Sequence, residues 1–345
     1  MKYIALLLCF IVAIILTPFV KKIAIRIGAV DQPNQRKIHA KTMPRLGGLA
    51  IFISFMIGFI IFNPDSPYFW PIFIGAILVT ATGILDDIYD LSAKVKFLVQ
   101  LLAATIVVLG GAQITFINLP FGETLHFGYL SVPITIFWIV GVTNAINLID
   151  GLDGLAAGVS SIALITISGL AISLGDGFVA FVGFMLLGST LGFLVYNFHP
   201  AKIFMGDTGA LFLGYMIGVL SILGFKNATL FSLIVPITIL GVPLLDTFFA
   251  IVRRVVHKKP FFSPDKLHLH HCLLNLGFGH KQTVILIYSM SALFSLAAII
   301  FTKSTMWGTT IMLLALTILV EVLVEITGLI SKNYRPLLKL LERRK

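Results

Sequence analysis

Three carboxylates follow directly on one of the most apolar stretches of the chain. Residues 83–91 read GILDDIYDL, so Asp86, Asp87 and Asp90 come at the end of the run FWPIFIGAILVTATGIL. An unpaired carboxylate is costly to bury, and such a cluster at the edge of an apolar phase needs a cation or a solvated loop. This stretch therefore raises the question of what else gathers at the same edge.

A second polar pattern lies in the segment NAINLIDGLDGL. Asn144, Asn147 and Asp150 recur every three residues, so on a helix they fall within one third of its circumference. Gly151 offers a break that can turn Asp153 back toward the same side. The spacing predicts a polar stripe that leads to the end of a helix.

A third candidate is Asp207, which stands between two glycines in MGDTG, ahead of an apolar helix. A carboxylate with backbone N–H groups nearby suits a hydrated divalent cation beside phosphates. Oxygen ligands predominate and a Cys/His zinc set is missing, which favours Mg²⁺, with Mn²⁺ as the alternative, over zinc. The basic residues that we expect to hold phosphate oxygens are Arg45, Lys41, Lys94, Lys96 and Lys202.

The fourth motif is PDKLHLHH. His268 and His271 are three residues apart, as metal ligands can be, but Asp265 and Lys266 beside them suggest recognition of an anionic substrate. We favour substrate contact over a metal site.

The elements that position these residues are membrane helices. Hydrophobic residues make up 58% of the 345 residues, and the mean hydropathy is +1.02, which predicts an all-α polytopic integral membrane protein. The first segment lacks a small-residue cleavage site and is expected to be a mature helix. Eleven transmembrane segments are expected, at residues 3–24, 47–62, 69–85, 95–111, 132–148, 154–174, 177–196, 209–224, 229–252, 283–302 and 306–329.

Lysines and arginines fall almost entirely on alternate connections. Of 25 in the chain, only Lys2, Lys226 and Lys303 lie on the other side of this topology. Basic residues accumulate on the cytoplasmic side, which places the N-terminus outside and the C-terminus in the cytoplasm. Residues 113–130 are then expected to form a small extracellular hairpin.

The same topology accounts for the net charge of +10. Basic loops beside a membrane meet anionic lipid headgroups, so membrane lipids are expected partners and nucleic acid is not. We expect residues 1–330 to form a single transmembrane catalytic domain. Residues 331–345 are expected to form a basic amphipathic cytoplasmic tail on the membrane surface.

All four polar motifs lie on cytoplasmic connections in this topology, which predicts that they line one cleft. Each alone has a structural alternative. Asp86 and Asp87 could cap a helix, and Asn144 and Asn147 could hydrogen-bond between helices. Four such motifs on one face favour a functional site.

In this order, the motifs RKIHAKTMPRLGG, GILDDIYDLSAKVK, NAINLIDGLDGLAAG, FMGDTGALFLG and PDKLHLHH resemble those of the polyprenyl-phosphate N-acetylhexosamine-1-phosphate transferases, from about residue 20 to 285. The chain is most similar to the bacterial undecaprenyl-phosphate N-acetylglucosamine-1-phosphate transferases. The resemblance implies transfer of a sugar 1-phosphate from a UDP-N-acetylhexosamine to undecaprenyl phosphate, with Mg²⁺ and release of UMP. It also implies a bacterial plasma membrane enzyme with a cytoplasmic active site, a first step of teichoic acid or other envelope glycan synthesis, and a possible homodimer.

The resemblance implies roles for single residues. Asp207 matches the principal Mg²⁺ ligand and Asn147 a second ligand or polar support. Lys96 matches a diphosphate contact, and Phe204 and Asp153 match the uracil site. The expected catalytic residues are Asp86, Asp87, Asp150, His270 and His271, and the expected substrate-binding residues are Arg45, Lys96, Asn144, Asp153, Phe204 and His268.

Two other functions remain open from the sequence. A phospho-N-acetylmuramoyl-pentapeptide transferase is the nearer one, although Leu269 interrupts the run of histidines typical of that branch. A transporter of nucleotide sugars or lipid-linked intermediates is the other. Asp246, inside an apolar segment next to Pro243, is the residue that most resembles a transporter site, and its bland interpretation is a kink with Asp246 facing the cleft.

Overall fold

The structure is a computed structural model that describes residues 1–31, 42–118, 124–225, 233–256, 258, 267–330, 334–337 and 339. The expected tail falls largely outside these residues. The first half of the chain forms helices α1 (Lys2–Ile27), α2 (Gly48–Phe62), α3 (Phe69–Tyr89), α4 (Ala93–Leu109), α5 (Ser131–Ile149) and α6 (Leu155–Ser173). The second half forms α7 (Gly177–Asn197), α8 (Gly206–Phe225), α9 (Ile234–Ile239), α10 (Gly241–Val256), α11 (Leu269–Asn275), α12 (His280–Phe301) and α13 (Met306–Thr327).

The all-α polytopic architecture is confirmed. Among the described residues, eight helices are long and apolar enough to cross a membrane, namely α1, α3, α5 with the short 3-10 turn before it (Gly128–Leu130), α6, α7, α8, α12 and α13. Helices α2 and α4 occupy two more of the expected segments but are shorter, with 15 and 17 residues. The expected segment 229–252 contains two helices, α9 and α10, which meet at Leu240 and Gly241.

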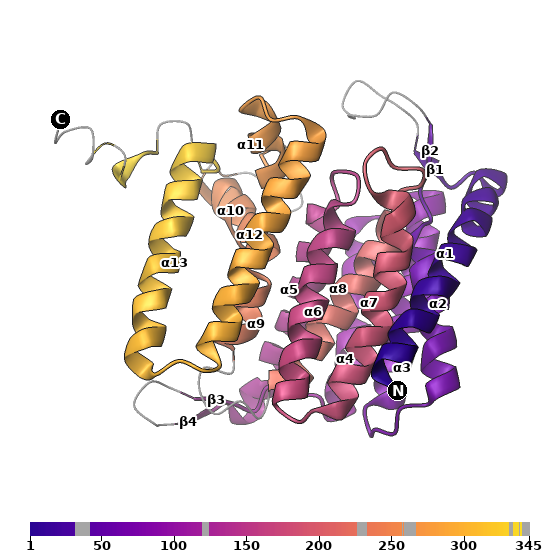
Figure 1. Ribbon diagram of the computed structural model, residues 1–345, viewed down its shortest axis with the longest axis horizontal. Helices are drawn as coiled ribbons and strands as arrows, with labels where there is room; N and C mark the ends of the chain where they lie inside the picture. The colour runs from indigo at the N-terminus through magenta and orange to yellow at the C-terminus, as the bar shows by residue number, and fades with distance from the viewer. Residues whose placement is uncertain are drawn as a thin grey trace.

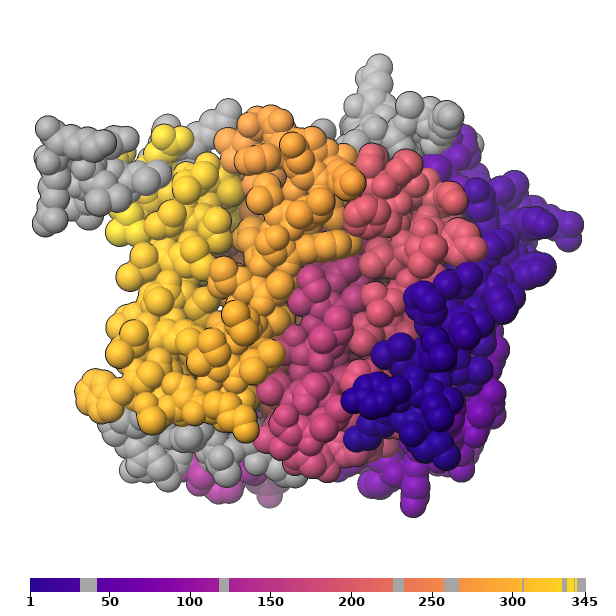
Figure 2. Space-filling model, in the orientation of Figure 1, coloured from indigo at the N-terminus to yellow at the C-terminus, as the bar shows by residue number. Residues whose placement is uncertain are grey.

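Helix α8 is the centre of the fold. After its first two residues it is apolar on all sides and buried from Thr208 to Phe225, as a helix surrounded by other helices must be. Helices α2, α3, α5 and α6 pack around it. On the face seen in Figure 2, the side chains of α13, α12, α6, α7 and α1 form adjacent bands.

Two small antiparallel sheets lie at opposite ends of the helices (Figure 1). Strands β3 (Phe116–Asn118) and β4 (Thr124–His126) form the predicted hairpin, at the end where α1 begins. Strands β1 (Val30–Asp31) and β2 (Met43–Pro44) lie at the other end, with α11. The polar connections meet at this second end.

Candidate active site

A cleft of about 490 Å³ opens at the end of the helices that carries β1, β2 and α11. The predicted convergence is confirmed, because residues from the first, third, fifth, seventh and ninth connections or from the helix ends beside them line it. Its polar lining consists of Asp31, Arg45, Asp87, Asn147, Asp150, Asp153, Asn197, His199, Asp207, His271 and His280. Phe204 lines it as well.

The carboxylate of Asp87 caps the first turn of α8. Its oxygens accept hydrogen bonds from Asp207 N (3.0 Å), Thr208 N (3.1 Å) and Thr208 Oγ1 (2.6 Å). The first N–H groups of a helix have no partner within it, so an acceptor from α3 satisfies them. Asp87 is 2% exposed. The structural alternative of helix capping is therefore realised for Asp87, between two helices.

Glycines allow this close contact. A Cβ atom on Gly83 of α3 would lie 2.4 Å from Thr208 Cα, so a larger residue would push α3 and α8 apart. Gly206 has φ +72°, and a Cβ atom there would lie 2.4 Å from Asp87 Oδ2. The sequence MGDTG is thus required by the backbone as well as by the chemistry of Asp207.

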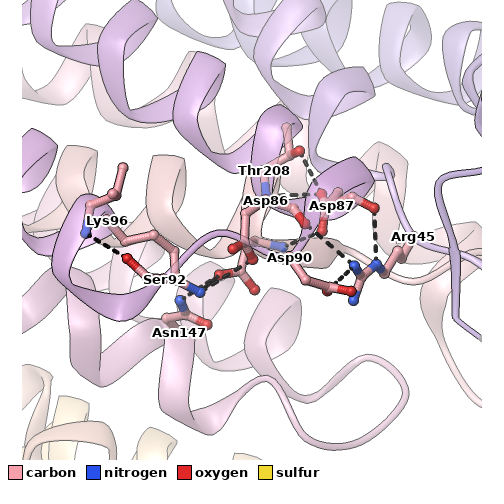
Figure 3. A network of polar contacts seen from close by, with 10 residues as sticks. Arg45, Asp86, Asp87, Asp90, Ser92, Lys96, Asn147 and Thr208 are labelled. Carbon is pink, nitrogen blue, oxygen red and sulfur yellow. Dashed lines mark hydrogen bonds and ion pairs between the residues drawn. The ribbon is translucent and has the colours of Figure 1, made fainter. Parts of the chain in front are cut away.

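Lys96 pairs with the carboxylates of both Asp86 and Asp207. Figure 3 shows Lys96, Asp86 and Asn147 in one network of polar contacts. The Nζ atom of Lys96 lies 2.7 Å from Asp207 Oδ2 and 3.2 Å from Asp86 Oδ2. Asn147 donates from Nδ2 to the same oxygen of Asp207 at 3.2 Å. The two expected metal ligands, Asp207 and Asn147, are therefore neighbours, and the ammonium of Lys96 supplies the positive charge beside them.

Arg45 holds the C-terminal end of α3. Its Nε atom donates to Asp87 O (3.1 Å), and its Nη2 atom donates to Asp86 O (3.3 Å) and pairs with the carboxylate of Asp90. The last carbonyls of a helix lack partners, and a cation there is favourable. Arg45 also lines the cleft. It combines a structural role with a position where it can contact substrate.

Asp150 lies at the C-terminal end of α5, where the predicted break occurs. Burial, followed by the charges of Asp207, Asp87 and Asp153, raises the pKa of the Asp150 carboxyl to about 8. Asp86 and Asp207 thus contact Lys96, and Asp87 and Asp150 lie near Asp207. This set of hard oxygen donors, with more negative than positive charge, fits a divalent cation such as Mg²⁺.

Asp153 forms a hydrogen-bonded cluster with two histidines. Its Oδ2 atom lies 2.8 Å from His199 Nδ1 and accepts from Ala201 N (3.1 Å), while its backbone N–H donates to His280 Nε2 (3.1 Å). Asp153, His199 and His280 offer ligand atoms within 4.8 Å of one another. However, the two rings lie 4.3 Å apart and only 23° from parallel, so one ion cannot lie in the plane of both. We interpret the cluster as a structural contact that holds three segments of the cleft wall together.

The histidines of the ninth connection take different positions. His271 lines the cleft, whereas His270 is 3% exposed and packs against Gly151. Burial, followed by the charge of His271, lowers the pKa of His270 to about 3, so its ring is neutral at physiological pH. His268 is buried in a pair with Asp246 rather than placed at the cleft.

Three further candidates, Asp86, Lys96 and Asn144, are not among the residues that line the cleft. Asp86 and Lys96 pair with each other, and Lys96 also pairs with Asp207 in the lining. Asn144 donates from Nδ2 to Gln100 Oε1 (2.6 Å) and Val140 O (2.8 Å), so it links α5 to α4. Conversely, Asp31, His199 and His280 line the cleft but were not among the candidates. His199 stands in the stretch NFHPAKIFMGDTG, and its nearness to Asp207 in sequence was the available signal. Nothing in their spacing pointed to Asp31 or His280.

Comparison with known proteins gives the class first. The family model described as glycosyl transferase family 4 matches residues 69–225. The chain is 48% identical over 343 residues to the probable undecaprenyl-phosphate N-acetylglucosaminyl 1-phosphate transferase of Bacillus subtilis, with 99% of this chain and 96% of that protein covered. The chain therefore belongs to glycosyl transferase family 4.

Two relatives with lower sequence identity are also similar to the chain. The chain is 34% identical to the decaprenyl-phosphate N-acetylglucosaminephosphotransferase of Mycolicibacterium smegmatis, over 92% of this chain and 86% of that protein. It is 33% identical to the phospho-N-acetylmuramoyl-pentapeptide-transferase of Chlorobium chlorochromatii, over 79% of this chain and 82% of that protein. Of these three relatives, the two named for N-acetylglucosamine have higher sequence identity to the chain than the pentapeptide transferase has.

Proposed function

We propose that the chain transfers N-acetylglucosamine 1-phosphate from UDP-N-acetylglucosamine to undecaprenyl phosphate and releases UMP, as the first membrane step of teichoic acid or another cell-envelope glycan. The observation that carries this proposal is the cleft, in which Asp87, Asp150, Asp207 and Phe204 converge from distant connections at one end of the helices, with Lys96 paired to Asp207. Near full-length similarity to the Bacillus subtilis transferase supports the choice of both substrates. A soluble anionic donor and a lipid acceptor can meet only at such a membrane surface.

The reaction forms a bond between an oxygen of the lipid phosphate and the β-phosphorus of the donor. The bond between that phosphorus and the bridging oxygen breaks, and UMP leaves with the oxygen and its electron pair. A phosphate monoester is largely dianionic at neutral pH, so it needs little help from a base. We infer direct attack, with Asp86 orienting the acceptor and Lys96 contacting the diphosphate.

Mg²⁺ is the proposed cofactor, with Mn²⁺ as the substitute. Asp207 would hold the ion, with Asn147 as second ligand after a rotation that presents its amide oxygen. The ion, when bound, would neutralise charge on the diphosphate. Lys96, which pairs with Asp207 here, is then free to turn toward the phosphates.

For the topology we propose eleven crossings, with the N-terminus outside and the cleft on the cytoplasmic face of the bacterial plasma membrane. The distribution of Lys and Arg supports this orientation. A single-cysteine variant, Lys303→Cys in a Cys9→Ser, Cys272→Ser background, should react with an impermeant maleimide in intact cells. Reaction only after the membrane is opened would reverse the orientation.

The experiment for the function is UMP release by the purified protein with undecaprenyl phosphate and Mg²⁺. UDP-N-acetylglucosamine, UDP-N-acetylgalactosamine and UDP-N-acetylmuramoyl-pentapeptide would be compared as donors. Lipid-dependent release with the first donor, lost in Asp207→Asn, is the expected result. Release with the pentapeptide donor alone would assign the chain to the other branch of the family. Uptake of intact UDP-sugar into sealed vesicles without UMP release would favour a transporter.

A further inference from the structure

Asp246 is a buried carboxylate that the proposed reaction does not use. It lies in α10 among apolar residues and is 2% exposed. A carboxylate in such a place destabilises the fold unless both oxygens have partners. The groups that contact Asp246 therefore indicate its role.

Both oxygens of Asp246 contact the start of α11. The Oδ2 atom lies 2.9 Å from His268 Nδ1, and the Oδ1 atom accepts from Leu269 N at 2.8 Å. His268, the residue that precedes α11, makes no side-chain cap of its own. Asp246 thus caps α11 from another helix, much as Asp87 caps α8. The break expected near Pro243 is present between α9 and α10, but the carboxylate of Asp246 contacts His268 and Leu269 and does not line the cleft.

A docked α11 positions the histidines that follow. His270 packs against Gly151 in the cleft wall, where a Cβ atom would lie 2.3 Å from His270 Nε2. His271, next to it with ring centroids 4.2 Å apart, lines the cleft itself. With only seven residues, α11 is too short to be stable without such anchors.

We propose that Asp246 is a positioning residue for the transfer reaction, which docks α11 through His268 and so holds His271 where it contacts the anionic part of the donor. This inference rests on the proposed function for its kinetic consequence. The docking of α11 itself can be measured without turnover.

The first measurement is a split of kinetic constants. Asp246→Asn places an amide N–H₂ group or a neutral oxygen against His268, which weakens the charged hydrogen bonds. We expect the KM for UDP-N-acetylglucosamine to rise about tenfold, while the affinity for UMP and the KM for undecaprenyl phosphate stay within about twofold. UMP lacks the sugar phosphate that His271 is placed to contact.

The second measurement uses the natural Cys272 on α11, which is 5% exposed. In a Cys9→Ser background, Asp246→Asn should increase the rate of maleimide labelling of Cys272 by about tenfold or more. Asp176→Asn is the matched control. Asp176 caps α7 by accepting from Val179 N at 2.9 Å, so its loss should leave both the donor KM and the labelling rate unchanged.

Each outcome decides the matter. An unchanged labelling rate in folded Asp246→Asn would overturn the docking role, whether or not the wild type is active. Faster labelling with an unchanged donor KM, or with an equal loss of UMP affinity, would overturn the positioning role. A wild type that releases no UMP from any donor would refute the proposed function, and the labelling rate would still test the inference.

Discussion

Asp87 offers the sharpest separation of structural from chemical roles in the cleft. Asp87→Asn removes the charge at the N-terminus of α8 and leaves one acceptor oxygen for three donors on Asp207 and Thr208. Hydrogen bonds to a charged acceptor contribute about 1.5–3 kcal/mol each. The loss of at least one of them, together with the charge at the helix end, should destabilise the protein by about 3 kcal/mol.

The assay is thermal unfolding in detergent, followed by tryptophan fluorescence, beside UMP release. We expect Tm to fall by on the order of 5 °C, and kcat to fall because Asp207 loses its support. Asp86→Asn is the control. Asp86 pairs with Lys96, and Lys96 still has its pair with Asp207 when Asp86 is changed. The change also removes the repulsion between the carboxylates of Asp86 and Asp207. The free energy of unfolding should therefore change by less than about 1 kcal/mol. An Asp87→Asn protein as stable as the wild type but inactive would refute the capping argument and assign Asp87 to the chemistry.

Three further results are expected. Gly206→Ala should lower both stability and activity, because φ is +72° and the added Cβ would lie 2.4 Å from Asp87 Oδ2, whereas Gly169→Ala, with open space around its Cβ, should behave as wild type. The pKa of His270 is lowered to about 3, so only the unfolded chain binds a proton below about pH 6.5. Stability should then fall by about 2 kcal/mol between about pH 7.5 and 5, and a His270→Gln protein with an equal fall would contradict this. EDTA should abolish UMP release and Mn²⁺ should restore part of it, while activity that persists after exhaustive chelation would exclude the metal role of Asp207.

The sequence predicted which segments would meet, because hydropathy and basic loops together determine which connections share a face. Asp207 with Asn147, and Asp150 with Asp153, are at the cleft as predicted. The break after α5 also lies where Gly151 suggested it. These predictions depend on the spacing of polar residues and on the connection in which each lies, and both can be determined from the local sequence.

The roles of single side chains were harder to predict. His268 pairs with Asp246, and Asn144 pairs with Gln100, since both have a closer partner than the cleft. These partners are 22 and 44 residues away, and the choice depends on how two helices are rotated about their axes. Hydropathy does not report that rotation for helices with a weak amphipathic pattern, such as α4 and α5, which carry Gln100 and Asn144. Helix α10 is amphipathic, but its pattern does not specify that Asp246 pairs with His268.

The two capping carboxylates, of Asp87 for α8 and of Asp246 for α11, support different parts of the cleft. The C-terminal end of α3 meets the N-terminal end of α8. Arg45 compensates the negative end of the α3 dipole, and Asp87 compensates the positive end of the α8 dipole. The opposite ends of the two helix dipoles also stabilise the contact. Asp86 and Asp207 are therefore held where α3 meets the buried helix α8, and Lys96 of α4 pairs with both. In the wall formed by α11, by contrast, Asp246 is one anchor, beside the packing of α11 on α12 and of His270 on Gly151. Changes at Asp87 should accordingly impair turnover with any substrate, whereas changes at Asp246 should act mainly on the donor.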